Sequence, residues 1–281
     1  MHIMELLGRS RVRVEGERVV EASRPLIEWC PLFEKVRGIK RVTEEAAAGN
    51  MEFRIRRHGT FTPRRRLDMG TFVGFGASES MMTGLRRGVI DAAVTVCDGA
   101  GTVITSNPQL VQGMGGWISG LAETDPIPEV LEGISARGGH VLSPQDARID
   151  QLEGARWAAS HGYVRFAVTV ADARTALELR DLEREAGVRI MVVGVHLTGI
   201  GREDAQLLLS VADIVTACAS KHIRELARPL VQVGTAVPLF GLTRWGKELL
   251  VERALEVDQP LLINTMPLPV LPEGKQPRPL V

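Results

Sequence analysis

Ile90–Val103 read IDAAVTVCDGAGTV, a run of small and β-branched side chains that gives way to glycines just after Cys97. This pattern predicts a buried strand over residues 89–96, followed by a loop whose backbone can come close to a ligand. A shorter echo, ADIVTACAS, occupies residues 212–220 and carries Cys218. Because α/β proteins tend to place their chemistry at the ends of buried strands, both cysteines are candidate site residues.

The composition indicates an ordinary globular protein. Of 281 residues, 44% are hydrophobic and 24% are charged, and basic and acidic residues number 34 each. Balanced charge and only 4% aromatic residues argue against a nucleic-acid surface. No apolar run approaches the roughly 20 residues that cross a bilayer. The first residues lack the pattern of a signal peptide, and three widely spaced cysteines favour a reducing compartment, so we expect a cytoplasmic location.

The second half of the sequence alternates predicted strands and helices. Strands are predicted over 139–142, 164–170, 188–195, 213–218, 230–237 and 261–264, and helices over 126–137, 149–161, 173–186, 202–211, 220–227 and 241–257. This alternation is typical of a Rossmann-like α/β fold with a mostly parallel sheet covered on both faces. The proline-rich tail from residue 266 is predicted to be an extended arm.

The first half is less regular. We expect a β-hairpin within residues 3–20, a short helix over 43–48, a strand over 51–55 and a strand–turn–helix–strand unit over 71–97. Residues 106–125 are rich in glycine and predict a long irregular loop. The chain is therefore divided into a mixed α/β part, residues 1–125, and a Rossmann-like part, residues 126–281, which includes the proline-rich arm.

Three readings of the cysteines remain open. Cys30, Cys97 and Cys218 could be buried for packing, since a free cysteine behaves as a small hydrophobic residue. Their thiolates could hold an iron–sulfur cluster with one iron open to substrate, although no compact cysteine motif supports a metal site. Alternatively, one thiol could be activated by its surroundings without any metal.

Two further groups could bind or react. Gly74, Gly76 and Ser78 join a predicted strand to a predicted helix, where backbone N–H groups could bind an anion or simply form a tight turn. The basic loop at residues 64–66 could close over such an anion or be solvated. Asp98 and His196 follow predicted strands and are candidate catalytic groups beside the cysteines, since histidine can act as an acid, base or ligand near neutral pH.

Several long strings carry a resemblance to a known family. They occupy Pro25–Phe33, Phe72–Met82, Ile90–Ile104, Ala212–Ser220, Leu261–Pro272 and Gly274–Pro279. Together these segments resemble the methanogenesis marker protein 8 family of methanogenic archaea, over essentially the whole chain. The resemblance implies a link with organisms that make methane through methyl-coenzyme M reductase, and it supplies no catalytic residues.

These observations lead to one main expectation and two alternatives. We expect a methanogenesis-associated accessory factor, maturation factor or enzyme with a cysteine-lined cleft between its two parts. Its partners would be a methanogenic enzyme complex or that complex's assembly factors. The first alternative is a binding protein for a small anionic or phosphorylated ligand at residues 74–80. The second is a structural subunit of a methanogenic enzyme complex whose tail docks on a partner.

Overall fold

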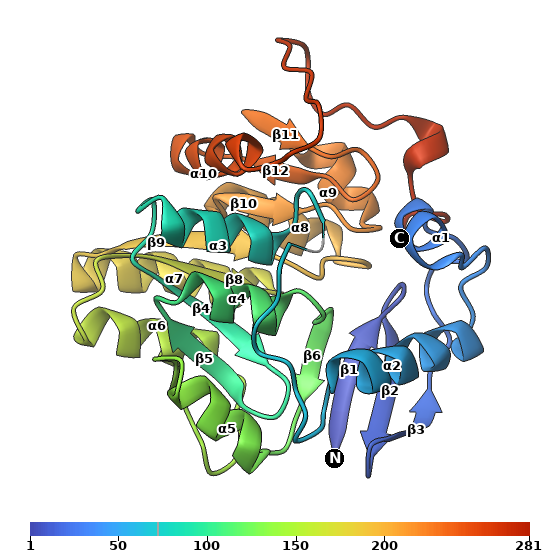
Figure 1. Ribbon diagram of the computed structural model, residues 1–281. Coiled ribbons are helices and arrows are strands. Elements are labelled where there is room, and N and C mark those ends of the chain that lie inside the picture. Colours follow the sequence, from blue (N-terminus) through green and yellow to red (C-terminus); the bar gives the residue numbers. More distant parts are fainter. Residues whose placement is uncertain (72) are drawn as a thin grey trace.

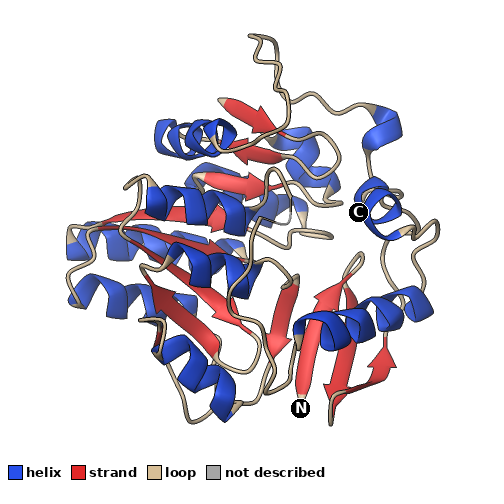
Figure 2. Cartoon of the chain, viewed as in Figure 1, coloured by secondary structure: helices blue, strands red, loops and turns tan. Residues whose placement is uncertain are grey.

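The computed structural model describes residues 1–71 and 73–281. It confirms an α/β protein built on two sheets (Figures 1 and 2). The smaller sheet has the strand order β3-β2-β1-β6 and is antiparallel throughout. The larger sheet has eight strands in the order β11-β12-β10-β9-β8-β4-β5-β7.

The smaller sheet contains the predicted N-terminal hairpin and one strand from far along the chain. Its strands are β1 (His2–Leu6), β2 (Ser10–Glu15), β3 (Arg18–Ala22) and β6 (Gly120–Glu123). Helix α2 (Glu44–His58) covers this sheet, and Met51 and Ile55 pack on Met4 and Val12. The short helix α1 (Pro31–Arg37) begins directly after the predicted bend.

The larger sheet is mixed, which corrects the expectation of a mostly parallel sheet. Its strands are β4 (Ala92–Cys97), β5 (Gly101–Thr105), β7 (His140–Val141), β8 (Arg165–Val170), β9 (Arg189–Gly194), β10 (Ile214–Thr216), β11 (Val231–Val233) and β12 (Leu239–Gly241). Strands β4, β8, β9 and β10 run parallel at the centre, and the outer strands pair antiparallel. The mixture arises because β4–β5 and β11–β12 are hairpins, which join antiparallel strands by short turns.

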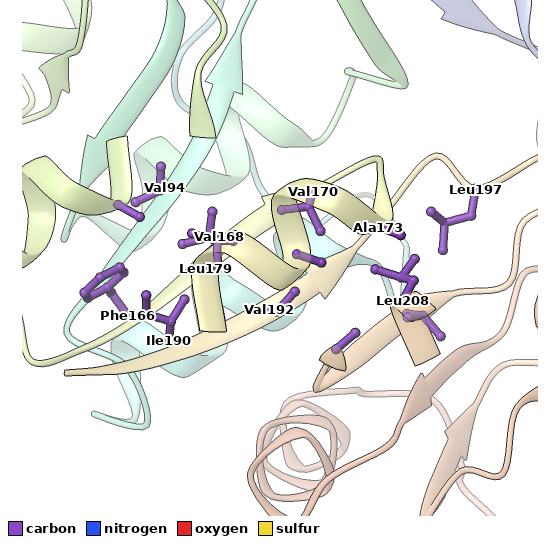
Figure 3. Packing of buried hydrophobic residues seen from close by; sticks show 14 of the residues in the cluster. Val94, Phe166, Val168, Val170, Ala173, Leu179, Ile190, Val192, Leu197 and Leu208 are labelled. Atoms are coloured by element: carbon purple, nitrogen blue, oxygen red, sulfur yellow. The ribbon is translucent and has the colours of Figure 1, made fainter. Parts of the chain in front are cut away.

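Helices cover both faces of this sheet (Figure 1). They are α3 (Ala77–Arg86), α4 (Pro108–Gly115), α5 (Pro128–Ser135), α6 (Gln151–Ser160), α7 (Ala173–Ala186), α8 (Arg202–Val211), α9 (Lys221–Leu226) and α10 (Arg244–Leu255). On one face, α6, α7 and α8 pack on Val94, Phe166 and Val192 (Figure 3). On the other face, α3 and α10 pack on Ala93 and Met191, as the twofold alternation of strand side chains requires.

Four local predictions were wrong. Residues 51–55 belong to helix α2, and residues 106–125 contain α4 and β6 in place of a long loop. No strand forms at residue 71 or at 73–76, and the predicted contribution of Phe72 lies outside the described residues. Residues 261–264 are exposed and pair with no strand in the described chain. In the first two cases, helical packing onto a sheet overrode the local pattern.

The sheet pairing runs across residue 125. Strand β4 belongs to the first predicted part, yet it pairs with β8 of the second part through Ala92↔Phe166 and its neighbours. The division into residues 1–125 and 126–281 thus stays a prediction, while the eight-stranded sheet draws on both. None of the helices among residues 1–71 and 73–281 has the length and apolar character that crossing a membrane requires.

Candidate functional site

The Cys97–Asp98 segment forms a hairpin turn that is sealed inside the protein. Asp98 is fully buried, and its Oδ1 lies 2.8 Å from the Nε of the equally buried Arg65. The backbone N–H of Phe61 donates to the other carboxylate oxygen of Asp98 at 2.7 Å. Both oxygens of this carboxylate therefore accept hydrogen bonds from the protein. In the structure Asp98 stabilises the fold, whereas the sequence pattern predicts a catalytic group at this position.

Cys97 lies in an apolar cluster with Val103, Leu110 and Met114 and has no exposed surface. Burial raises the pKa of its thiol, and the neighbouring Asp98 carboxylate adds to that rise. A thiol in such surroundings is a poor nucleophile because the reactive thiolate is disfavoured.

The three cysteines do not form one cluster. Across residues 1–71 and 73–281, no group of three or more His, Cys, Asp or Glu side chains could hold a metal ion. Cys30 and Cys218 interact electrostatically with each other, whereas Cys97 interacts with Arg65 and Asp98. The three thiols therefore do not fit an iron–sulfur cluster.

The glycine turn at residues 74–78 holds an anion that the protein supplies itself. Gly76 is the N-cap residue of α3, and Glu79 in the first turn is 2% exposed. The Glu79 carboxylate accepts hydrogen bonds from the Val73 N–H (3.3 Å) and from the Ser78 hydroxyl (3.1 Å). A Cβ at Gly76 would lie only 2.2 Å from a Glu79 oxygen. The carboxylate thus lies in the first turn of the helix, where it complements the helix dipole and lies where an external anion was expected.

The carboxyl end of β10 carries the most accessible thiol of the three. Cys218 is partly exposed, while Cys30 and Cys97 are buried. Its φ of 44° lies in the left-handed region, which a side chain with a Cβ rarely adopts. Its sulfur lies 3.3 Å from the Thr216 hydroxyl. Backbone strain of this kind is concentrated at functional sites, so it favours Cys218 as a functional residue.

A buried arginine lies beside Cys218. Arg224, on α9, is 2% exposed, and its Nε and Nη2 donate to the backbone oxygen of Cys218 at 3.1 and 2.5 Å. Burial lowers the pKa of Arg224 to about 10, and the nearby Cys218 and Cys30 thiols oppose this shift. Burial also raises the pKa of Cys30, which precedes Pro31 in the predicted extended conformation.

His196 lies after the end of the neighbouring strand β9 and also has a left-handed φ, 58°. Its Nε2 lies 2.8 Å from Oε2 of Glu5 on β1, and this contact is the largest cause that lowers the pKa of Glu5 to about 2. Gly120, which pairs with Glu5 in the smaller sheet, leaves room for the ring, since a Cβ there would lie 2.3 Å from Nε2. The pair thus connects the carboxyl edge of the larger sheet to the smaller sheet.

The structure therefore packs Cys30 in one apolar cluster with Ala219, the residue after Cys218, and places His196 just after the neighbouring strand β9. Cys97 lies in a different cluster, where Asp98 pairs with Arg65. Sequence reasoning missed Glu5, Gly120 and Arg224. Glu5 and its partner His196 are 191 positions apart, and Arg224 and its partner Cys218 are 6 positions apart. No short sequence motif indicates these contacts. Positive φ at a non-glycine residue is likewise invisible in the sequence.

The fold and the strand-end thiol define a class: an α/β protein with a mixed central sheet and a candidate site at its carboxyl edge. The chain belongs to the family described as "Uncharacterized protein conserved in archaea (DUF2099)", which matches residues 2–255. It is 47% identical over 283 residues to "Uncharacterized protein MJ0054" of Methanocaldococcus jannaschii, an alignment covering 100% of this chain and 99% of the relative.

Proposed function

We propose that this protein is a thiol-dependent catalyst in which Cys218 attacks a small disulfide and Cys30 resolves the product. The observation that carries the proposal is that the buried Cys30 packs in the same apolar cluster as Ala219, the residue after the partly exposed Cys218, while Arg224 donates to the Cys218 backbone oxygen. Two-step thiol–disulfide exchange needs two thiols. The first must be accessible to the substrate, and the second must be able to attack the mixed disulfide that the first one forms.

The proposed reaction is balanced in two steps. The Cys218 thiolate attacks one sulfur of a disulfide R–S–S–R′, forms a mixed disulfide with RS and releases R′S⁻. The Cys30 thiol then loses its proton and attacks the Cys218 sulfur, which releases RS⁻ and leaves a Cys30–Cys218 disulfide. The substrate disulfide gains two electrons and the protein dithiol loses them. Two molecules of a thiol R″SH would return the protein to its reduced form by the reverse exchange and leave as R″–S–S–R″.

His196 has a supporting role in this proposal. Glu5 holds one of its ring nitrogens, and the other makes no hydrogen bond to any part of the chain that the structure describes. A histidine oriented in this way can take up or deliver the proton that thiol exchange moves. Its position on the strand next to β10 places it at the same sheet edge as Cys218.

The biological setting is part of the same proposal. The resemblance to the methanogenesis marker protein 8 family supports a role in maturing or maintaining a methanogenic enzyme or its cofactor, with that enzyme or its assembly factors as partners. Thiol exchange suits such a role because it restores reactive sulfur groups without a bound cofactor. Co-purification of a tagged copy with a methanogenic enzyme would support this setting.

A chromogenic disulfide tests the chemistry directly. Under denaturant-free conditions, 5,5′-dithiobis(2-nitrobenzoate) should release two equivalents of thionitrobenzoate from the wild type and leave a Cys30–Cys218 disulfide. Cys30→Ser should release one equivalent and retain the adduct on Cys218, visible as a mass increase. Cys218→Ser should react slowly, because both remaining thiols are buried.

Cys97→Ala is the matched control, since its thiol lies in the separate apolar cluster. It should behave like the wild type. A wild-type protein that keeps a stable adduct on Cys218 would show that Cys30 does not resolve it. A wild type that releases no thionitrobenzoate would remove the reactive thiol altogether.

A further inference from the structure

A surface hollow of about 320 Å³ lies at the C-terminal end of helix α2, and none of the three cysteines lines it. Six of the residues that line it are charged or titratable: Arg56, Arg57, His58, Arg64, Arg66 and Glu17. Four arginines and one glutamate thus line one small hollow. The protein as a whole has no net charge, so this local excess of positive charge is a property of the site.

Two separate segments converge to make the hollow. The last turn of α2 contributes Arg56 and Arg57, and the loop that follows contributes Arg64 and Arg66. Gly59 reverses the chain with a φ of 67°, and a Cβ there would lie 2.3 Å from the backbone oxygen of Arg64. Only glycine allows this close return, which brings the loop arginines back against the helix end.

A buried ion pair fixes the loop in place. Arg65, between the two outward arginines, turns inward to Asp98 and also donates to the backbone oxygens of Gly113 (3.1 Å) and Met114 (2.9 Å). The backbone N–H of Arg66 donates to the His58 oxygen at 3.0 Å. The loop is therefore held before any ligand arrives, which reduces the ordering cost of binding.

The arginines are only partly neutralised. Arg56 pairs with Glu52 at 3.3 Å, and Arg64 pairs with Glu17 at 2.6 Å. The side chains of Arg57 and Arg66 make no ion pair or hydrogen bond with residues 1–71 or 73–281. Basic residues in the last turn of a helix can simply complement the helix dipole, but this accounts for Arg57 and not for Arg66, which lies in the loop.

His58 adds an independent sign of a missing partner. It is 6% exposed and stacks on Trp117 with ring centroids 3.8 Å apart. Both of its ring nitrogens are buried and have no hydrogen-bond partner in the described part of the chain. An unsatisfied buried polar atom destabilises the folded protein, and such a cost is usually balanced by a function or a bound group.

We propose that this hollow, the arginine hollow, is a binding site for a small phosphorylated ligand, independent of the proposed thiol chemistry. One guanidinium group can bind two phosphate oxygens at once, and Arg57 and Arg66 are the two lining arginines whose side chains have no partner among the described residues. The volume of the hollow suits a diphosphate or a small phosphate ester. A polynucleotide would need a longer basic surface with stacking aromatics, which the balanced charge and scarce aromatic residues do not favour.

Isothermal titration calorimetry with inorganic pyrophosphate tests the site on the full-length protein. Arg57→Gln with Arg66→Gln should raise the Kd at least about tenfold, because each substitution removes a charge-assisted hydrogen bond. The matched control is Arg174→Gln with Arg184→Gln, which removes the same charge from side chains that are 89% and 73% exposed on α7. The control should change the Kd by less than about twofold.

Equal weakening in both double variants would reduce the effect to net charge and overturn the proposal, as would no binding at millimolar pyrophosphate. Tighter binding of a single-stranded oligonucleotide than of pyrophosphate would overturn the small-ligand assignment in favour of nucleic acid. A second measurement needs no variant: phenylglyoxal should modify Arg57 and Arg66 in the wild type, and pyrophosphate should protect both. Modification at the same rate with and without pyrophosphate would also overturn the site.

Discussion

Arg65 and Asp98 form an ion pair whose two side chains have no exposed surface. Taking two charges out of water is costly, and here the cost is offset by several hydrogen bonds to the pair. The pair ties the loop after α2 to the β4–β5 hairpin and to the end of α4. One residue that a sequence pattern marks as catalytic thus serves to join three elements.

Asp98→Asn should destabilise the protein by about 3–5 kcal/mol, because it leaves the Arg65 charge buried without its partner. The urea midpoint of unfolding, followed by circular dichroism, measures this change. The matched control is Asp68→Asn, which breaks the exposed ion pair between Asp68 and Arg137 and should cost about 1 kcal/mol or less. Equal losses in the two variants would mean that burial does not set the strength of the inner pair.

His58 makes stability depend on pH. Burial, followed by the charges of Arg65 and its neighbours, lowers the pKa of His58 to about 4 from the ordinary value near 6.5. Between these values the unfolded chain binds a proton that the folded protein does not, so the free energy of unfolding falls as pH drops from 6.5 to 4. His58→Phe keeps an aromatic ring against Trp117 and should flatten this fall.

The measurement is a series of urea titrations between pH 4 and 7. Some slope should remain in the variant, because burial also lowers the pKa of His2 to about 4. A variant whose stability falls as steeply as that of the wild type would exclude His58 as a source of the dependence.

At the scale of elements, close backbone approaches set the packing of α4. A Cβ at Gly113 would lie 1.8 Å from the backbone oxygen of Leu67. Gly113→Ala should therefore force the helix and the loop apart and cost about 1–3 kcal/mol. Gly49→Ala in the interior of α2 is the control, since nothing lies within 4 Å of its added methyl.

Gly49→Ala should raise stability by about 0.5–1 kcal/mol through the better helix propensity of alanine. If the space around the added methyl decides the outcome, urea unfolding should show a lower free energy of unfolding for Gly113→Ala and a higher one for Gly49→Ala. Destabilisation by both substitutions would point instead to a general need for backbone freedom.

Elements with strong end signals could be predicted from the sequence. The boundaries of α7 match the prediction because the Asp172 side chain accepts from the Thr175 N–H, and Gly187 ends the helix with a left-handed φ. The start of α4 carried a comparable signal, since Asn107 is its N-cap and Pro108 its first residue. The glycines that follow led to the prediction of an irregular loop, because glycine disfavours a helix interior.

One sequence signal for a turn was interpreted instead as part of a catalytic site. Asp98-Gly99 between two apolar runs is a strong hairpin signal, and it forms the turn between β4 and β5. The expected cysteine cluster did not form for a different reason: β4 and β10 run in the same direction, but the sheet order places β8 and β9 between them and keeps their carboxyl ends apart. The sequence could suggest that two of the three cysteines lie together. It could not show that these are Cys30 and Cys218, which are 188 positions apart.

At the scale of the whole molecule, the C-terminal segment connects the two thiol-bearing regions. The backbone of Arg278 pairs with Trp29, the residue before Cys30, through hydrogen bonds of 2.9 and 3.0 Å. The N–H of Val281 then donates to the oxygen of Ala219, the residue after Cys218, at 3.0 Å. The chain end consequently lies beside α1 (Figure 1) and holds both segments next to each other.

Removing residues 276–281 should therefore loosen the pair without deleting either thiol. We expect Cys218 to be alkylated by iodoacetamide at least about twofold faster, and the Tm to fall by about 2–4 °C for each kcal/mol lost. Leu262→Ser with Ile263→Ser is the control, because these side chains are 93% and 87% exposed on the preceding segment. It should leave both quantities unchanged. If the truncated protein is alkylated at the wild-type rate, the tail does not shield Cys218, and access to the thiol must be set by β10 and α9 alone.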